Sequence, residues 1–227
     1  PLPPSSAASD VYKRQALGVQ ETKFLGYKDL ESNSEVLVIW KDLKRIDSAK
    51  NKEEIFLATN QTPFYAESGG QIGDKGKFAS KSSTGSILDC KKQGKVYIHK
   101  ALVEKGKIKT GDVIKMSVEK EKRSAIAIHH SSTHLVHAAL RQVLGDHVQQ
   151  KGSLVDENKL RFDFSHDKPL TQNEITQIET IVNKQGLNNS EVKTELMNID
   201  DALKSGAMAL FGEKYDDCLL YTSDAAD

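Results

Sequence analysis

The chain has 227 residues, which is long enough for one or two domains and for a sizeable buried core. Hydrophobic residues make up 37% of it and charged residues 28%, and no run approaches the roughly 20 apolar residues of a membrane span. The 32 basic and 32 acidic residues balance, so overall charge does not indicate a nucleic-acid ligand. The two cysteines, Cys90 and Cys218, cannot build a disulfide framework, and no leader is evident, so we predict a cytoplasmic protein with no membrane partner.

The two ends of the chain differ from the rest. The DNA string TGTCTCTTATACACATCTGACGCTGCCGAC encodes residues 218–227. Its reverse complement, translated from the second base, encodes residues 6–14. The string resembles the transposon adapter used to prepare sequencing libraries. We therefore expect residues 1–15 and 218–227 to be non-native, and the native part to be a fragment cut at both ends.

The first native segment, residues 16–119, is rich in short β-branched runs separated by turns of Gly, Asn, Ser and Lys. Such spacing predicts a small β-barrel-like domain. The predicted strands cover residues 34–41, 54–59, 86–89, 96–102 and 112–119.

The second native segment, residues 120–217, changes to a helical period followed by a hairpin. A helix is expected from about Lys120 to Leu144, ending at Gly145. Thr171 and Glu174 form the capping box of another helix that ends before Gly186. The remaining predicted elements are a hairpin of residues 147–155 and 159–166, a strand near 192–196 and a short helix opened by Asp200. The predicted fold class is therefore α+β, a barrel-like segment followed by a truncated α+β domain.

The first helix carries four of the seven histidines within residues 129–137. A period of 3.6 residues places His130, His134 and His137 on one face, opposite an apolar stripe. We expect that face to lie in bulk water or in a cleft, and His130 and His134, at i and i+4, have the spacing of two zinc ligands. Ser131 stands where a zinc protease needs glutamate, which disfavours protease chemistry. The apolar stripe is Leu135, Val136, Ala139, Leu140 and Val143.

A glycine-rich stretch, TPFYAESGGQIGDKG at residues 62–76, matches neither the P-loop nor the dinucleotide pattern. Its glycines are expected to supply positive φ angles in a tight loop between strands. Short lysine clusters at residues 91–95, 105–109 and 120–123 are either solvated faces or phosphate contacts.

Four stretches in consecutive order resemble the editing region of bacterial alanyl-tRNA synthetases: TPFYAESGGQIGDKG, HHSSTHLVHAALRQVLGDHVQQKGSLV, LRFDFSH and GAMALFGEKY. This resemblance covers about residues 16–217. It implies an editing domain that hydrolyses mischarged Ser-tRNA(Ala) and Gly-tRNA(Ala), with the acceptor end of tRNA(Ala) as partner. The parent enzyme ligates alanine to tRNA(Ala) with ATP and Mg²⁺ in a module missing from this chain.

The resemblance also assigns residues to the site. His130 and His134 are implied to be two zinc ligands, and Thr133 and Gln150 match positions that line the pocket, where their hydroxyl and amide read the hydroxyl of serine. Read without the resemblance, Thr133 packs a helix and Gln150 is a solvated strand residue. His129 and His137 are not expected to be ligands, although His137 has the position to orient one.

The chain departs from the family pattern at its end. In the family, GAMALFGEKY is followed by Cys-x-x-x-His, which supplies the other two zinc ligands; here no histidine follows Cys218. The zinc site is therefore expected to be incomplete and this chain inactive alone. Two other interpretations stay open: a free-standing trans-editing hydrolase of the same superfamily, and a non-catalytic tRNA-binding module.

Overall fold

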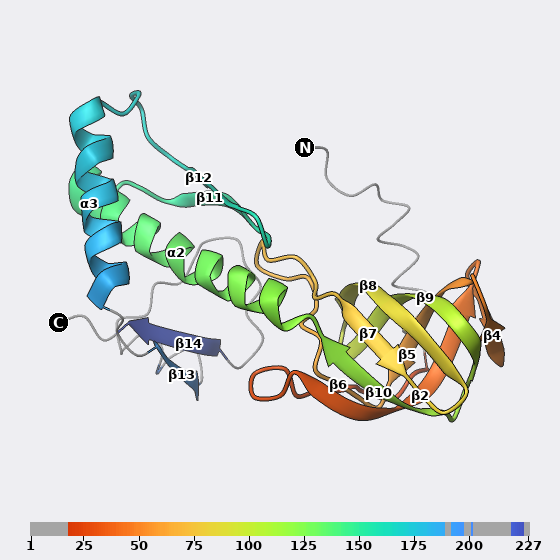
Figure 1. The fold of residues 1–227 in the computed structure, drawn as a ribbon. Coiled ribbons are helices and arrows are strands. Elements are labelled where there is room, and N and C mark those ends of the chain that lie inside the picture. Colours follow the sequence, from red (N-terminus) through yellow and green to blue (C-terminus); the bar gives the residue numbers. More distant parts are fainter. Residues whose placement is uncertain (1–17, 189–191, 198–200, 202–218, 225–227) are drawn as a thin grey trace. The chain divides into compact units, whose positions relative to one another are not determined.

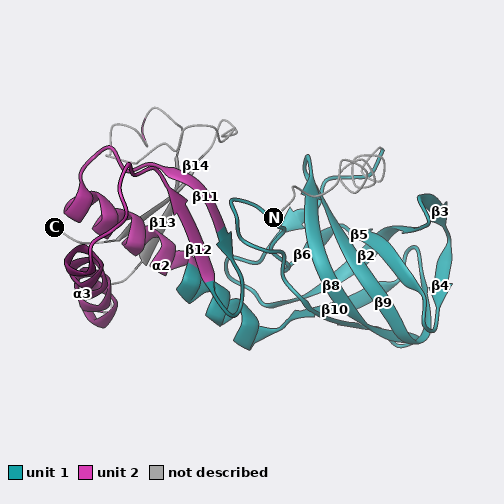
Figure 2. Ribbon diagram, turned by 90° about the horizontal axis from the view of Figure 1, so that it is seen from above, with its two compact units in different colours: residues 1–129, 154–159 teal, residues 130–153, 160–227 magenta. Residues whose placement is uncertain are grey.

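The computed structural model of the chain describes residues 18–188, 192–197, 201 and 219–224. The chain forms two compact units (Figure 2). Unit 1 comprises residues 1–129 and 154–159, and unit 2 comprises residues 130–153 and 160–227. No helix within the described ranges is both long and apolar enough to span a membrane.

Unit 1 is built around a closed antiparallel barrel (Figure 1). Its strands follow one another in the order β10, β7, β8, β9, β5 and β2, and a second pairing of β10 with β2 closes the ring. The prediction of a small barrel in an α+β protein is confirmed. The barrel strands are β2 (Glu31–Lys41), β5 (Glu54–Thr59), β7 (Gly76–Ala79), β8 (Ser83–Gln93), β9 (Val96–Lys109) and β10 (Val113–Val118).

Four shorter strands complete unit 1. β1 (Lys23–Phe24) pairs with β6 (Gln61–Thr62) in parallel, β3 (Lys44–Ile46) pairs antiparallel with the end of β2, and β4 (Ser48–Lys50) pairs antiparallel with β9. All five predicted strands coincide with observed strands, although β8 and β9 are several residues longer than expected.

The barrel core consists of side chains that alternate inward along the strands. Two glycines let it close. A Cβ at Gly76 would lie 2.1 Å from the Ser117 carbonyl oxygen, and one at Gly85 would lie 2.2 Å from that of Leu102, so neither strand pairing tolerates a side chain there. The fully buried core side chains include Ile39, Ile55, Leu57, Phe64, Phe78, Ile87, Ile108, Ile114 and Met116.

His99 on β9 is a fully buried polar residue of the barrel. Its Nε2 is 2.8 Å from Thr62 Oγ1, and its Nδ1 is 3.3 Å from the Leu57 carbonyl oxygen, to which Nδ1–H donates. Burial lowers the pKa of His99 from its ordinary 6.5 to about 4, and the Leu57 hydrogen bond only partly opposes this. The barrel therefore holds His99 neutral.

We predict that His99 makes the barrel sensitive to acid. Between pH 6.5 and 4 the unfolded chain binds a proton that the folded chain does not, so the free energy of unfolding falls as pH falls through this window, by about 3 kcal/mol in total. Urea denaturation followed by the fluorescence of Trp40, the only tryptophan, measures it. The His99→Gln variant should lose this part of the pH dependence. An unchanged pH profile in that variant would contradict the assignment.

The glycine-rich stretch forms a tight loop, as predicted, but only some of its glycines need positive φ. Gly69 and Gly70 have φ of 57° and 82°. Gly73 and Gly76 do not, which corrects the expectation for these two residues. At Gly73 the reason is close approach, since a Cβ would lie 2.3 Å from the Cys90 carbonyl oxygen.

The same loop holds the tip of a hairpin and the first turn of a helix within unit 1. Val155 N–H donates to the Gly70 carbonyl oxygen at 2.8 Å, and Ile72 N–H donates to that of Val155 at 3.1 Å. Asp74 is only 1% exposed and forms an ion pair with the Arg123 guanidinium, whose Nε–H donates to Asp74 Oδ1 at 2.9 Å. The loop is thus a structural junction of unit 1.

Unit 2 contains most of a long helix, most of a hairpin, and a second helix. Helix α2 (Lys120–Leu144) has the predicted bounds, and Gly145, with φ of 113°, follows it. The hairpin strands are β11 (Gln150–Val155) and β12 (Leu160–Phe164), as predicted. Helix α2 and helix α3 (Gln172–Asn188) share a core of Ala139, Leu140, Val148 and Ile178, and Phe162 and Phe164 of β12 pack against it.

The capping box of α3 is confirmed. Thr171 N–H and Oγ1 both donate to Glu174 Oε2 at 2.7 Å, and Glu174 N–H donates to Thr171 Oγ1 at 3.3 Å. The helix continues through Gly186 to Asn188, which corrects the predicted end. At Gly186 a Cβ would meet open space, and its φ lies outside the left-handed range that ends helices, so this glycine is simply a helical residue.

Beyond α3, strand β13 (Val192–Met197) pairs antiparallel with β14 (Leu219–Asp224). The strand predicted near residue 192 is confirmed. Asp200, the predicted start of a short helix, and Cys218 lie outside the described residues. β14 falls in the segment predicted to be adapter-encoded, and its origin stays a prediction.

Candidate functional site

The predicted ligand pair lies on one side of α2. The ring centroids of His130 and His134 are 5.1 Å apart, with 40° between the ring planes. Two imidazoles bound to one tetrahedral Zn²⁺ at about 2.0–2.1 Å place their centroids about 5.2 Å apart. The observed centroid spacing therefore matches that of two imidazoles that share a zinc ion.

The surroundings of His130 also suit a metal ligand. Burial lowers the pKa of His130, and the neighbouring His134 lowers it further. A zinc ligand must be a neutral imidazole, so this shift favours the state that binds. His134 is exposed and His130 is half-buried, so the pair is accessible from solvent.

His137 does not share that exposed face, which corrects the prediction. It is 5% exposed, and its ring centroid lies 5.2 Å from that of Phe162 on β12. Burial lowers the pKa of His137, while a hydrogen bond to the Val148 backbone raises it. Its Nε2 is buried with no hydrogen-bond partner among the described residues. The helix packs on a broader stripe than predicted, because Phe162 covers the flank where His137 lies.

The other predicted pocket residues lie on the same elements. Thr133, next to His134 in the chain, is 7% exposed and belongs to the buried side of α2 together with His137. Gln150 is half-buried at the start of β11, where its Nε2 donates to Ser153 Oγ at 3.2 Å. His129, predicted not to be a ligand, donates from Nδ1 to the Asp156 carbonyl oxygen at 2.7 Å. The pocket roles of Thr133 and Gln150 stay predictions.

The His130 and His134 pair has no third metal ligand within the described ranges of the chain. The one described group of three or more potential ligands is elsewhere, at His147, His166 and Asp167. Cys90 is buried in the barrel core with its Sγ 3.8 Å from the Phe64 carbonyl oxygen, and burial raises the pKa of its thiol. The pair therefore offers two potential metal ligands, and its part in a zinc site stays a prediction.

Sequence reasoning missed two features. One is the Arg123–Asp74 ion pair, for which the sequence gives no local signal. The other is the His147, His166 and Asp167 cluster. The predicted hairpin carried a signal for it, because pairing residues 147–155 with 159–166 brings the first residue of one arm near the last residue of the other.

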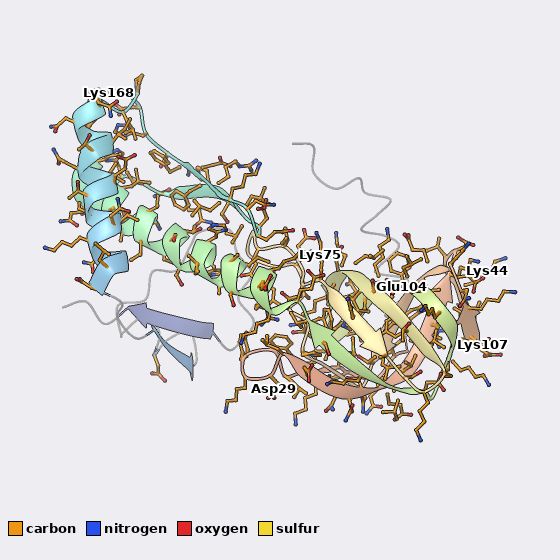
Figure 3. All side chains as sticks on the ribbon, viewed as in Figure 1. Asp29, Lys44, Lys75, Glu104, Lys107 and Lys168 are labelled. Atoms are coloured by element: carbon orange, nitrogen blue, oxygen red, sulfur yellow. The ribbon has the colours of Figure 1, made fainter. Side chains whose placement is uncertain are left out.

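The short lysine clusters lie on the outside of unit 1. Lys91 pairs with Glu67 at 3.2 Å and Lys122 with Glu119 at 2.7 Å. Lys105, Lys107 and Lys109 are exposed along β9, and Figure 3 shows Lys44 and Lys107 projecting from the surface of the barrel. Lys91 and Lys122 are therefore engaged in ion pairs on the surface. Phosphate contact by the lysines of β9 stays a prediction.

Comparison with known proteins gives the family. Residues 5–122 match the family described as tRNA synthetases class II (A). The chain therefore belongs to the class II (A) tRNA synthetase family.

Within this family, the similar curated proteins are alanine–tRNA ligases. The chain is 49% identical over 199 residues to an alanine–tRNA ligase of Nitrosomonas europaea, covering 87% of the chain and 23% of the relative. It is 49% identical over 205 residues to the alanine–tRNA ligase of Rhodopseudomonas palustris, and this match covers 90% of the chain and 23% of the relative. The chain spans about a quarter of the length of these relatives and is a fragment by comparison with them. The predicted resemblance to alanyl-tRNA synthetases is confirmed.

Proposed function

We propose that this chain carries most of the editing domain of an alanyl-tRNA synthetase, with a zinc-dependent site that hydrolyses Ser-tRNA(Ala) and Gly-tRNA(Ala). The observation that carries the proposal is the His130 and His134 pair, at zinc-ligand spacing on one helix, in a chain closely similar to alanine–tRNA ligases. The whole enzyme would ligate alanine to tRNA(Ala) with ATP and Mg²⁺.

A second hydrolytic site meets a physical need of such an enzyme. A pocket shaped for alanine rejects an added hydroxyl or a missing methyl by only about 1–3 kcal/mol, which is too little for accurate translation. An editing site corrects this only if it reads the amino-acid side chain again. In our proposal Thr133 and Gln150 provide that reading, because a hydroxyl and an amide can hydrogen-bond the hydroxyl of serine.

The roles of the protein groups follow from their chemistry. His130 and His134 would hold Zn²⁺ as neutral imidazoles, together with the Cys-x-x-x-His of the family, which this chain does not contain. Held there, zinc would supply one of two things: an anchor for the amino group of the substrate, or polarisation of water near the ester. The acceptor end of tRNA(Ala), mischarged with serine or glycine, is the proposed partner.

Two other functions are tested against this one. A free-standing trans-editing hydrolase would have a start codon shortly upstream of Ala16, whereas a synthetase would have adenylation motifs there. A non-catalytic tRNA-binding module would bind tRNA(Ala) without hydrolysing Ser-tRNA(Ala), even when the chain is extended through Cys-x-x-x-His. The gene on both sides of residues 16 and 217 and a deacylation assay of the extended chain distinguish the three.

This polypeptide should not activate alanine. The aminoacylation module, which binds ATP, is expected to lie outside it, so alanine-dependent ATP–pyrophosphate exchange should stay at background. The measurement uses the purified chain beside a full-length alanine–tRNA ligase as the positive control. Exchange above background would show that the assignment to the editing region is wrong.

Zinc affinity should depend on the missing ligands. Two imidazoles leave half of the coordination sphere to water, so isothermal titration should show zinc bound at His130 and His134 more than about 100-fold more weakly than in a chain extended through Cys-x-x-x-His. His130→Ala should weaken binding in both chains, and His129→Ala should weaken it in neither. Zinc that other residues bind remains in the His130→Ala chains and is subtracted. Equally tight binding of the remaining zinc by the short and extended chains would refute the ligand assignment.

A further inference from the structure

Two histidines that are distant in sequence meet beyond the ends of the β11–β12 hairpin in unit 2. His147 Nε2 lies 2.9 Å from His166 Nδ1, and the ring centroids are 5.2 Å apart. Asp167 follows directly, with Oδ1 3.9 Å from His166 Nδ1. One ligand atom from each of the three residues lies within 4.8 Å of the others. Neither the family match nor the proposed editing chemistry uses this cluster.

Hydrogen bonds of the Ser165 backbone and side chain hold the two arms in this position. Ser165 N–H donates to the Gln149 carbonyl oxygen at 3.0 Å, and Gln149 N–H donates to Ser165 Oγ at 3.1 Å. Ser165 Oγ in turn donates to the His147 carbonyl oxygen at 3.2 Å. Val148, between the two linked residues of its arm, is fully buried. The two histidines are therefore placed by the fold and not by a chance contact of free loops.

From this arrangement we propose that His147, His166 and Asp167 form a binding site for one Zn²⁺ ion, separate from His130 and His134. Two imidazoles on tetrahedral zinc have centroids about 5.2 Å apart and ligand nitrogens about 3.3 Å apart. The centroid distance already matches, but the two nitrogens now point at each other, so each ring must turn by about 35° and the nitrogens must separate by about 0.4 Å to converge on one ion. Without metal, one ring N–H donates to the nitrogen of the other ring.

The donor set selects the class of metal. Two imidazoles and one carboxylate suit zinc and similar transition metals, whereas Mg²⁺ and Ca²⁺ prefer oxygen ligands throughout. The side chain of His166 is 14% exposed and that of Asp167 is 78% exposed, so an ion reaches the cluster from solvent and water completes its fourth position. The bound ion would join residue 147, before β11, to residue 166, after β12, and so stabilise the folded hairpin.

The test uses a chain that lacks the other candidate ligands, carrying His130→Ala, His134→Ala and Cys218→Ser. Isothermal titration with Zn²⁺ should give one ion per chain. Adding His166→Gln, which keeps a hydrogen-bonding side chain, should weaken zinc binding by more than about 100-fold. Removing a residue that only hydrogen-bonds a metal ligand weakens binding by up to about 100-fold, and removing the ligand itself should cost more. The matched control is Asp146→Asn, because Asp146 is an exposed carboxylate next to His147 that pairs with Arg141 and is outside the cluster.

A second variant protects the test against misfolding. Asp167→Asn changes an exposed side chain, leaves both imidazoles in place and should weaken Zn²⁺ binding by at least about tenfold. Co²⁺ binding, followed by its visible absorption, should show the same order of variants. The proposal is overturned if the background chain binds no zinc, or if His166→Gln and Asp167→Asn bind it as tightly as the Asp146→Asn control.

Discussion

Replacing Arg123 with Ala should lower the free energy of unfolding of unit 1 by about 3–5 kcal/mol, because it leaves the Asp74 carboxylate buried without its cation. Asp74 is 1% exposed and the Arg123 side chain 17% exposed. The guanidinium also donates to the carbonyl oxygens of Gly26, at 2.7 Å, and Pro63, at 3.0 Å. A single side chain thus joins the first turn of α2 to two loops of unit 1, the one that contains Gly26 and the one that contains Pro63 and Asp74.

The neighbouring residue provides the control. Lys122 pairs with Glu119 at 2.7 Å, but both side chains are about 40% exposed, so Lys122→Ala should cost at most about 1 kcal/mol. Urea denaturation followed by Trp40 fluorescence reports on unit 1, since Trp40 is on β2 and 2% exposed. Similar denaturation midpoints for the two variants would show that the buried ion pair does not hold the loop to the helix.

The sequence predicts those strands of the barrel that contain short β-branched and apolar runs between turns. It misses β7, because Gly76–Ala79 has only four residues and only Phe78 among them is a large buried side chain. That strand forms because β10 and β8 supply backbone partners on both sides. β8 likewise extends through Lys91 and Lys92, since its ladder with β9 continues to Gln93 whatever the intrinsic preference of these lysines.

In the candidate site, too, the sequence predicts contacts within one element but not contacts between elements. Helical spacing alone correctly brings His130 and His134 together, because both lie on one element. The burial of His137 depends on Phe162 from another element, and the periodicity of α2 contains no information about that contact. The meeting of His147 and His166 depends on hairpin register, which local patterns fix only when both arms are considered together.

His134→Ala should abolish editing in a chain extended through Cys-x-x-x-His and loaded with zinc. Losing a metal that contributes several kcal/mol to transition-state stabilisation corresponds to about a 10³-fold slower hydrolysis of Ser-tRNA(Ala), or more, and zinc content should fall with it. Hydrolysis is measured by release of labelled serine, and zinc content by elemental analysis. Full activity with zinc lost would show that the metal has no part in the reaction.

Thr133→Val separates selectivity from metal binding at the same site. Valine keeps the shape of threonine and removes its hydroxyl, so zinc content should not change. Thr133 is 7% exposed, and loss of a buried polar contact costs about 1–3 kcal/mol of discrimination. The ratio of Ser-tRNA(Ala) to Ala-tRNA(Ala) hydrolysis should therefore shift by about 5- to 150-fold. If the ratio is unchanged while His134→Ala is inactive, Thr133 only packs the buried side of α2, and serine is read by another group.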